Sequence, residues 1–146
     1  MTHIIRAVDL SKAAHSQHEL ENFHHAVGVA RRVAADPRAT DVHVATAYLQ
    51  NIGYTARITK ADMIRAGIPG DVVRAVGKLE FRKDENFLTY LRRVSECHDT
   101  ALVAYHDFLE RLGELDPYGD DDLVRRFRRA AEDLNEAVNL NTPRSG

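Results

Sequence analysis

Hydrophobic residues return every three or four positions along most of the chain, which is the spacing of one face of an α-helix. No stretch shows the strict alternation of a half-buried β-strand, and we find no internal repeat and no linker between domains. We therefore predict an all-α fold with about seven to eight helices in a single domain over residues 1–146. Its core covers about residues 15–139, and residues 140–146 form a tail. The expected helices cover about residues 4–17, 23–36, 41–52, 59–66, 69–79, 87–94, 98–112 and 120–138.

Residues that start and stop helices lie at several of these boundaries. Pro37 ends the second helix, because proline lacks the N–H that would continue it. Thr40 is a good N-cap for the third helix, which Gly53 can terminate in a left-handed conformation. Gly67 stops the fourth helix, and Pro69 stands just inside the start of the fifth.

Composition and charge limit the classes of partner. A chain of 146 residues with 44% hydrophobic residues can bury one core, and its net charge of −2 provides no field that attracts nucleic acid or anionic membranes. Residues 42–56, the longest run without charged residues, are too few to cross a bilayer, which takes about 20. Cys97 is the single cysteine, which favours a reduced, cytoplasmic protein.

The last expected helix carries a group of four arginines opposite its apolar stripe. Pairing at i, i+4 is expected for Asp121 with Arg125 and for Arg128 with Glu132. Interleaved aromatic residues and a basic background are missing, so a solvated, salt-bridged face explains the arginines better than a nucleic-acid interface does.

Three segments carry candidate chemistry. The run of residues 45–49 is small and apolar and leads directly into Gln50 and Asn51. His25 opens the apolar part of the second helix, and Asp107 lies inside the apolar residues 101–109.

These segments, in this order and spacing, resemble the HD-domain phosphohydrolases, nearest to the branch of alarmone and nucleotide hydrolases. The resemblance covers about residues 15–139 and implies a helical bundle with a divalent metal held by His25, Gln50, Asn51 and Asp107. In the family, positions 50 and 51 are a His-Asp pair. The family's basic loop before the first histidine has no counterpart in this chain.

The departures from the family remove metal ligands. Gln50 offers a weak neutral oxygen where the family has an imidazole, and Asn51 lacks the charge of a carboxylate. Tyr54 and Thr55 stand where the family has a Glu-Asp pair. Two competent ligands remain, whereas transition-metal sites in proteins use three or four, so we expect no metal and no cofactor.

Other histidines do not complete the site. His43 lies seven residues before Gln50, about 10 Å along a helix, and is too distant to share a metal with it. The pair His98-Asp99 opens a helix, where an aspartate serves the helix start. Asp107 projects away from the apolar stripe of its own helix. It is therefore either a site residue, as the resemblance implies, or a solvated side chain.

Three functions remain open. The one we favour is an HD-like domain that has lost metal-dependent phosphohydrolase activity and binds a small molecule or a protein partner, and a homodimer is compatible with its exposed aromatic residues. Its pocket would be lined by His25, Gln50, Asn51, Tyr54 and Asp107.

The two alternatives are enzymes. In the first, His25 and Asp107 form a catalytic acid–base pair for an organic substrate, with Tyr48, Tyr54 or Tyr105 as a proton donor. In the second, the chain keeps nucleotide or alarmone phosphohydrolase activity with a weakly held divalent ion such as Mn²⁺.

Overall fold

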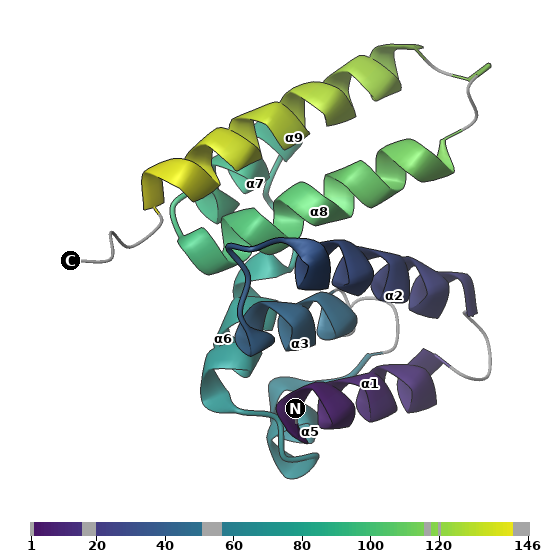
Figure 1. Cartoon of the computed structure of the whole chain (residues 1–146), viewed down its shortest axis with the longest axis vertical. Coiled ribbons are helices and arrows are strands. Elements are labelled where there is room, and N and C mark those ends of the chain that lie inside the picture. Colours follow the sequence, from purple (N-terminus) through teal and green to yellow (C-terminus); the bar gives the residue numbers. More distant parts are fainter. Residues whose placement is uncertain (1, 16–19, 51–56, 116–117, 120, 142–146) are drawn as a thin grey trace. The chain divides into compact units, whose positions relative to one another are not determined.

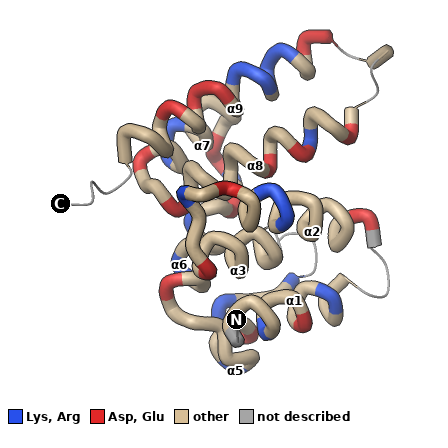
Figure 2. The backbone as a smooth tube through the Cα atoms, viewed as in Figure 1, with Lys and Arg blue, Asp and Glu red and all other residues tan. Residues whose placement is uncertain are grey.

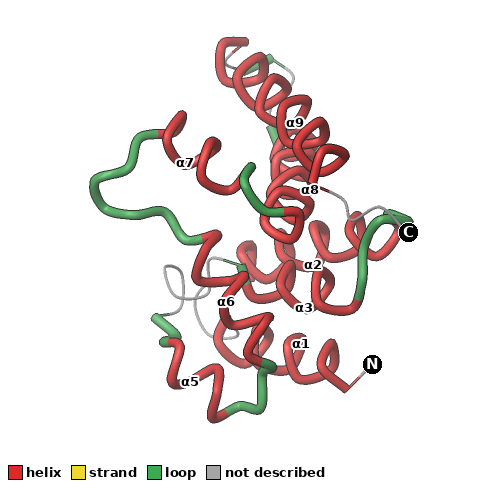
Figure 3. Tube along the Cα trace, turned by 90° about the vertical axis from the view of Figure 1, so that its left-hand side faces the viewer, coloured by secondary structure: helices red, strands yellow, loops and turns green. Residues whose placement is uncertain are grey.

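The fold is helical throughout the part of the chain that can be described. A computed structural model describes residues 2–15, 20–50, 57–115, 118–119 and 121–141, and these contain eight helices and no strand (Figure 3). The prediction of an all-α protein with seven to eight helices is confirmed. Within the described residues, no helix has the length and apolar character needed to cross a membrane.

The chain divides into two compact units, Met1–Glu80 and Phe81–Gly146. In the first unit, α3 packs against α1, α2 and α6, while α5 packs against α6 (Figure 1). The central position of α3 explains why its sequence is almost free of charge. The helices of this unit are α1 (Thr2–His15), α2 (Leu20–Ala35), α3 (Asp41–Leu49), α5 (Lys60–Arg65) and α6 (Gly70–Leu79).

The apolar stripes of four helices and one loop form the core of the first unit. Ala7 comes from α1, Leu49 from α3, and Val72 and Val76 from α6, and each is fully buried. Ile68 follows α5 and fills the same cluster. The core lies where the helical periodicity of the sequence places the apolar face of each segment.

Helix ends in the first unit mostly follow the predicted signals, with two corrections. Pro69, predicted just inside the start of the fifth helix, is instead the N-cap residue before α6. Thr40 precedes α3, and its backbone N–H donates a hydrogen bond of 2.7 Å to Nδ1 of His43. Gly67 follows α5 with a positive φ of 83°. The helix predicted to run to Gly53 instead ends at Leu49, because Gln50 has the extended angles φ −57° and ψ 141°. Gly53 itself lies outside the described residues.

The second unit consists of α7 (Phe87–Val94), α8 (His98–Glu114) and α9 (Asp121–Asn141). The two long helices, α8 and α9, pack side by side (Figure 1). Phe108 of α8 joins the three helices, because its ring lies 5.8 Å from that of Phe87 in α7 and 5.3 Å from that of Phe127 in α9, both edge to face.

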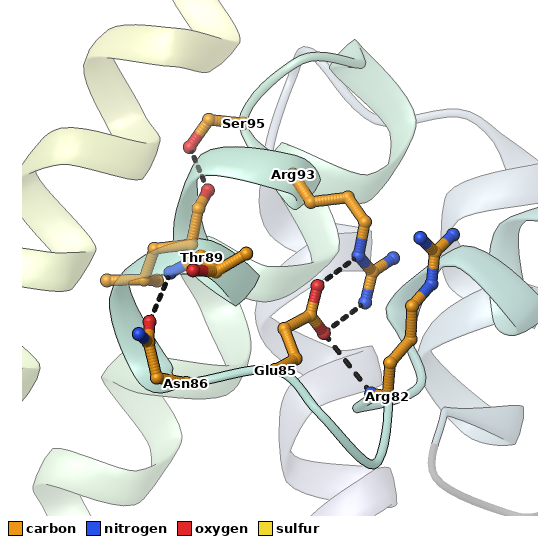
Figure 4. A network of polar contacts seen from close by, with 7 residues as sticks. Arg82, Glu85, Asn86, Thr89, Arg93 and Ser95 are labelled. Carbon is orange, nitrogen blue, oxygen red and sulfur yellow. Dashed lines mark hydrogen bonds and ion pairs between the residues drawn. The ribbon is translucent and has the colours of Figure 1, made fainter.

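A network of polar contacts holds the segment before α7 against that helix (Figure 4). Arg93 donates two hydrogen bonds to the carboxylate of Glu85, at 2.7 and 2.8 Å, and the side chain of Glu85 is 4% exposed. The backbone N–H of Arg82 also donates to this carboxylate. Asn86 caps α7 by accepting from the N–H of Thr89 at 2.8 Å. The bidentate contact between Arg93 and Glu85 is the strongest form of an arginine–carboxylate pair.

The ion pairs on α9 differ from the predicted ones. Arg125 contacts Asp122 at 3.1 Å, and Arg129 contacts Asp133 at 3.7 Å. The expected partner of Arg125 was Asp121, whose backbone carbonyl accepts from Arg125 instead. Both i, i+3 and i, i+4 neighbours are within reach of a long arginine side chain, so spacing alone does not select between them.

Two glycine-to-alanine substitutions should change stability in opposite directions. Gly77 is exposed inside α6, and an added Cβ meets no atom within 4 Å, so Gly77→Ala should stabilise the fold by about 0.5–1 kcal/mol. Gly67→Ala should destabilise the fold by about 1 kcal/mol or more. Gly67 has a positive φ, and an added Cβ would lie only 3.0 Å from Nη1 of Arg6. Urea unfolding measures both, and shifts of the same sign would contradict this account.

The contribution of Glu85 should depend on pH. Hydrogen bonding by Arg93 lowers the pKa of Glu85 from 4.5 to about 2 in the folded protein. The stability that this pair contributes is therefore present above about pH 4.5 and is lost as the pH falls towards 2. We expect Glu85→Gln to unfold more easily than the wild type by roughly 1 kcal/mol at pH 7, and equally near pH 2.

The exposed Glu132 is the control for this measurement, because it forms no described ion pair. Chemical denaturation of Glu132→Gln should show no comparable pH-dependent difference. If the stability difference between Glu85→Gln and the wild type stays constant down to pH 2, the ionised pair is not its cause.

Candidate functional site

The residues that the family resemblance assigns to the site are distributed over both units. His25 lies in α2 and is half-buried, and Gln50 follows α3 with an exposed fraction of 6%. Both belong to the first unit, whereas Asp107 lies in α8 of the second. Asn51 and Tyr54 lie outside the described residues. Asp107 is therefore the candidate whose surroundings within its own unit can be described in most detail.

Asp107 is a buried carboxylate with a positive partner on its own helix. Nε of Arg111 donates a hydrogen bond of 3.1 Å to Oδ2 of Asp107. The side chain of Asp107 is 10% exposed and that of Arg111 is 39% exposed. The spacing of four residues places the guanidinium one helical turn from the carboxylate, so α8 itself supplies the countercharge.

The interpretation of Asp107 as a solvated side chain is wrong. Asp107 was expected to project away from the apolar stripe of its helix, either as a site residue or as a solvated side chain, and it is buried. The apolar stripe of α8 is also covered, since Leu102 and Phe108 are buried. The periodicity of one helix identifies its most apolar face, but it cannot show that a second face is covered as well.

Tyr90 of α7 is a buried phenol whose pKa is affected by the charges of Asp107 and Arg111. It is 7% exposed, and its ring stacks on that of Phe81 with 4.0 Å between the ring centres. Burial raises the pKa of the Tyr90 phenol, and the negative charge of Asp107 raises it further. Tyr90 therefore remains protonated across the physiological pH range and can donate a hydrogen bond.

Arg111 also keeps its charge. Burial lowers its pKa, but the charge of Asp107 and the hydrogen bond to that carboxylate raise it, and the net direction is upward. Arg111 thus keeps a permanent guanidinium next to Asp107, and Tyr90 keeps a neutral phenol. Neither Tyr90 nor Arg111 can exchange a proton near neutral pH.

These side chains fit a divalent metal poorly. A cation bound to Asp107 would lie close to Arg111, and two positive unit charges about 4 Å apart repel by roughly 4 kcal/mol at the effective dielectric constant of a protein surface. Gln50 adds only a neutral amide oxygen to the family's ligand set. We therefore derive no reaction step through a metal.

Several histidines considered from the sequence have structural contacts in the fold. Nδ1 of His43 accepts a hydrogen bond from the backbone of Thr40, so this histidine serves as a partner in the cap of α3. Nδ1 of the buried His15 lies 2.9 Å from the carbonyl oxygen of Ser11. His98 and Asp99 begin α8, as predicted, and Cys97 is the N-cap residue of that helix.

The tyrosines proposed as proton donors have different surroundings. Tyr48 is half-buried against the core of the first unit. Tyr105 is half-buried in α8, with its ring 4.8 Å from that of the buried His106. The sequence analysis did not identify Tyr90, because its neighbour Asp107 is seventeen positions away and no local motif joins them. The pair of Asp107 and Arg111 had a local signal, the i, i+4 spacing of opposite charges.

Comparison with known proteins does not assign the chain to a family. The sequence matches no protein-family model, and no curated protein matches it. The resemblance to the HD-domain phosphohydrolases accordingly stays a prediction from the motifs of the sequence.

Proposed function

We propose that the chain is an HD-domain-like binding protein that does not act as a metal-dependent phosphohydrolase. The observation that carries this proposal is the ion pair between the buried carboxylate of Asp107 and Arg111. By the resemblance, this carboxylate would bind the metal. A protein side chain supplies the positive charge instead, so the carboxylate is compensated without an ion.

The amide residues at positions 50 and 51 support the same proposal. An amide in place of a metal-binding histidine or aspartate keeps the capacity to hydrogen-bond but loses strength as a ligand. Side-chain amides at these positions favour recognition of a small molecule or a protein partner by hydrogen bonds. Hydrolysis of a phosphate ester would need an activated water, which these groups are not suited to generate.

Metal analysis of protein purified without chelators tests the proposal. We expect well under one equivalent of Mn, Fe, Co or Zn, and no release of phosphate from nucleoside triphosphates when Mn²⁺ is added. Bound metal near one equivalent that is lost in Asp107→Asn would contradict the proposal and favour a retained phosphohydrolase. Asp84→Asn is the control, because Asp84 is an exposed aspartate in the same unit.

A second variant tests whether Arg111 provides the charge compensation. In Arg111→Gln, Asp107 keeps its burial but loses its countercharge, so we expect unfolding to become easier by about 1 kcal/mol. Added Mn²⁺ should not restore this loss, because the remaining donors are too weak to hold the ion. Thermal unfolding with and without Mn²⁺ measures the effect. If Mn²⁺ restores the stability of Arg111→Gln but not that of Asp107→Asn, Asp107 retains a metal site.

A further inference from the structure

A groove in the second unit lies between α7 and α9, and its lining does not include Asp107, Arg111 or Tyr90. Its volume is about 390 Å³, within the range of roughly 300–1,000 Å³ typical of binding pockets. Phe87, Leu88 and Leu91 of α7 and Ala130 of α9 give it an apolar lining. Leu88 is 70% exposed and adjoins the half-buried Phe87 and Leu91, so the apolar lining is open to solvent.

The α9 side of the groove is basic. Arg126 and Arg129 line it together with Asp133, and the spacing i, i+3, i+7 places these three side chains along one edge of α9. Figure 2 shows the band of Lys and Arg in the first half of this helix. Asp133 is 3.7 Å from Arg129, so one of the two positive charges is partly compensated.

Arg126 carries the second of the two positive charges that line the groove. Its guanidinium lies over the ring of Phe87, 5.8 Å from the ring centre, and it forms an ion pair with none of the carboxylates in the described residues. A cation held beside an apolar surface by an aromatic ring can meet an incoming carboxylate without first breaking another ion pair.

We propose that this groove binds an acidic amphipathic helix of a protein partner. Apolar side chains of that helix would contact Leu88, Leu91 and Ala130, and flanking glutamates or aspartates would pair with Arg126 and Arg129. The edge from Arg126 to Asp133 covers about 10 Å of α9, which equals the span of anchors at i, i+3 and i+7 on a bound helix. This site is separate from the proposed function around Asp107 and does not depend on it.

Two other occupants fit the charges less well. In a symmetric contact with a second copy, the same patch faces itself, so Arg126 and Arg129 would approach their own counterparts and repel them. An anionic membrane would be attracted by a cluster of free basic residues, but Arg125 and Arg129 are each paired with an aspartate on α9. A short acidic helix needs only the local charge of the groove.

Titration with three designed helical peptides tests the proposal. The first has leucines at i, i+3 and i+7 flanked by glutamates, the second replaces each glutamate by lysine, and the third replaces each leucine by serine. Fluorescence anisotropy should show saturable binding of the first peptide alone. Amide NMR signals of Leu88 and Leu91 should shift during that titration.

Variants of the groove locate the binding surface. We expect the double variant Arg126→Gln/Arg129→Gln, and separately Leu88→Ser, to weaken binding of the acidic peptide roughly tenfold. Arg128→Gln and Ile64→Ser should leave it unchanged, because these exposed residues lie outside the groove. All five substitutions in these four variants are at exposed positions, so thermal unfolding should show each variant folded.

Several results would overturn the proposal. They are absence of binding by the acidic peptide, equal binding of the lysine peptide, or equal effects of the Arg128 variant and the Arg126/Arg129 variant. Binding to phosphatidylserine vesicles that is lost in the groove variants, without peptide binding, would assign the surface to a membrane. Self-association that is lost in Leu88→Ser would assign it to a second copy. None of these results depends on whether Asp107 binds a metal.

Discussion

The ion pair of Asp107 and Arg111 determines which chemistry the second unit can support. A buried carboxylate needs a positive partner, because its charge is poorly solvated inside a protein. A metal ion can be that partner, or a guanidinium can. In this chain the guanidinium comes from the next turn of the same helix, so the compensation forms whenever α8 forms. The charge of Asp107 therefore has a partner from the protein itself.

The contacts around this pair extend to the start of the second unit. Burial and the charge of Asp107 raise the pKa of Tyr90. The ring of Tyr90 stacks on that of Phe81, and the guanidinium of Arg93 lies 5.5 Å from the centre of the Tyr90 ring. Arg93 in turn holds Glu85, whose pKa is lowered to about 2. Tyr90, Glu85, Arg93 and Arg111 therefore keep one charge state around neutral pH, so these contacts do not change with pH in that range.

Local patterns in the sequence predicted the helices well. Thr40 and Gly67 stand at helix boundaries as expected, since capping and left-handed backbone depend on only a few neighbouring residues. The early end of α3 at Leu49 was not predicted, because residues 45–52 are apolar enough to continue a helix. Burial of Asp107 was not predicted either, because the periodicity of one helix identifies only its most apolar face.

The candidate site was predictable only where its contacts are local. The pairing of Asp107 with Arg111 follows from their spacing, but the contribution of Tyr90 depends on how α7 and α8 pack. Similarly, the α7–α9 groove combines residues about forty positions apart, such as Phe87 and Arg126. Sequence patterns identified only the row of arginines on α9, because the exposure of Leu88 depends on how α7 packs.

The most direct test of the central claim is paramagnetic broadening by Mn²⁺ in amide NMR spectra of the wild-type protein. If Arg111 compensates Asp107, substoichiometric Mn²⁺ should broaden the amide signals near Asp107 no more than those near exposed carboxylates such as Asp84. Selective and saturable broadening of the α8 signals around Asp107 would contradict the account, because it would show that an ion binds there despite the guanidinium.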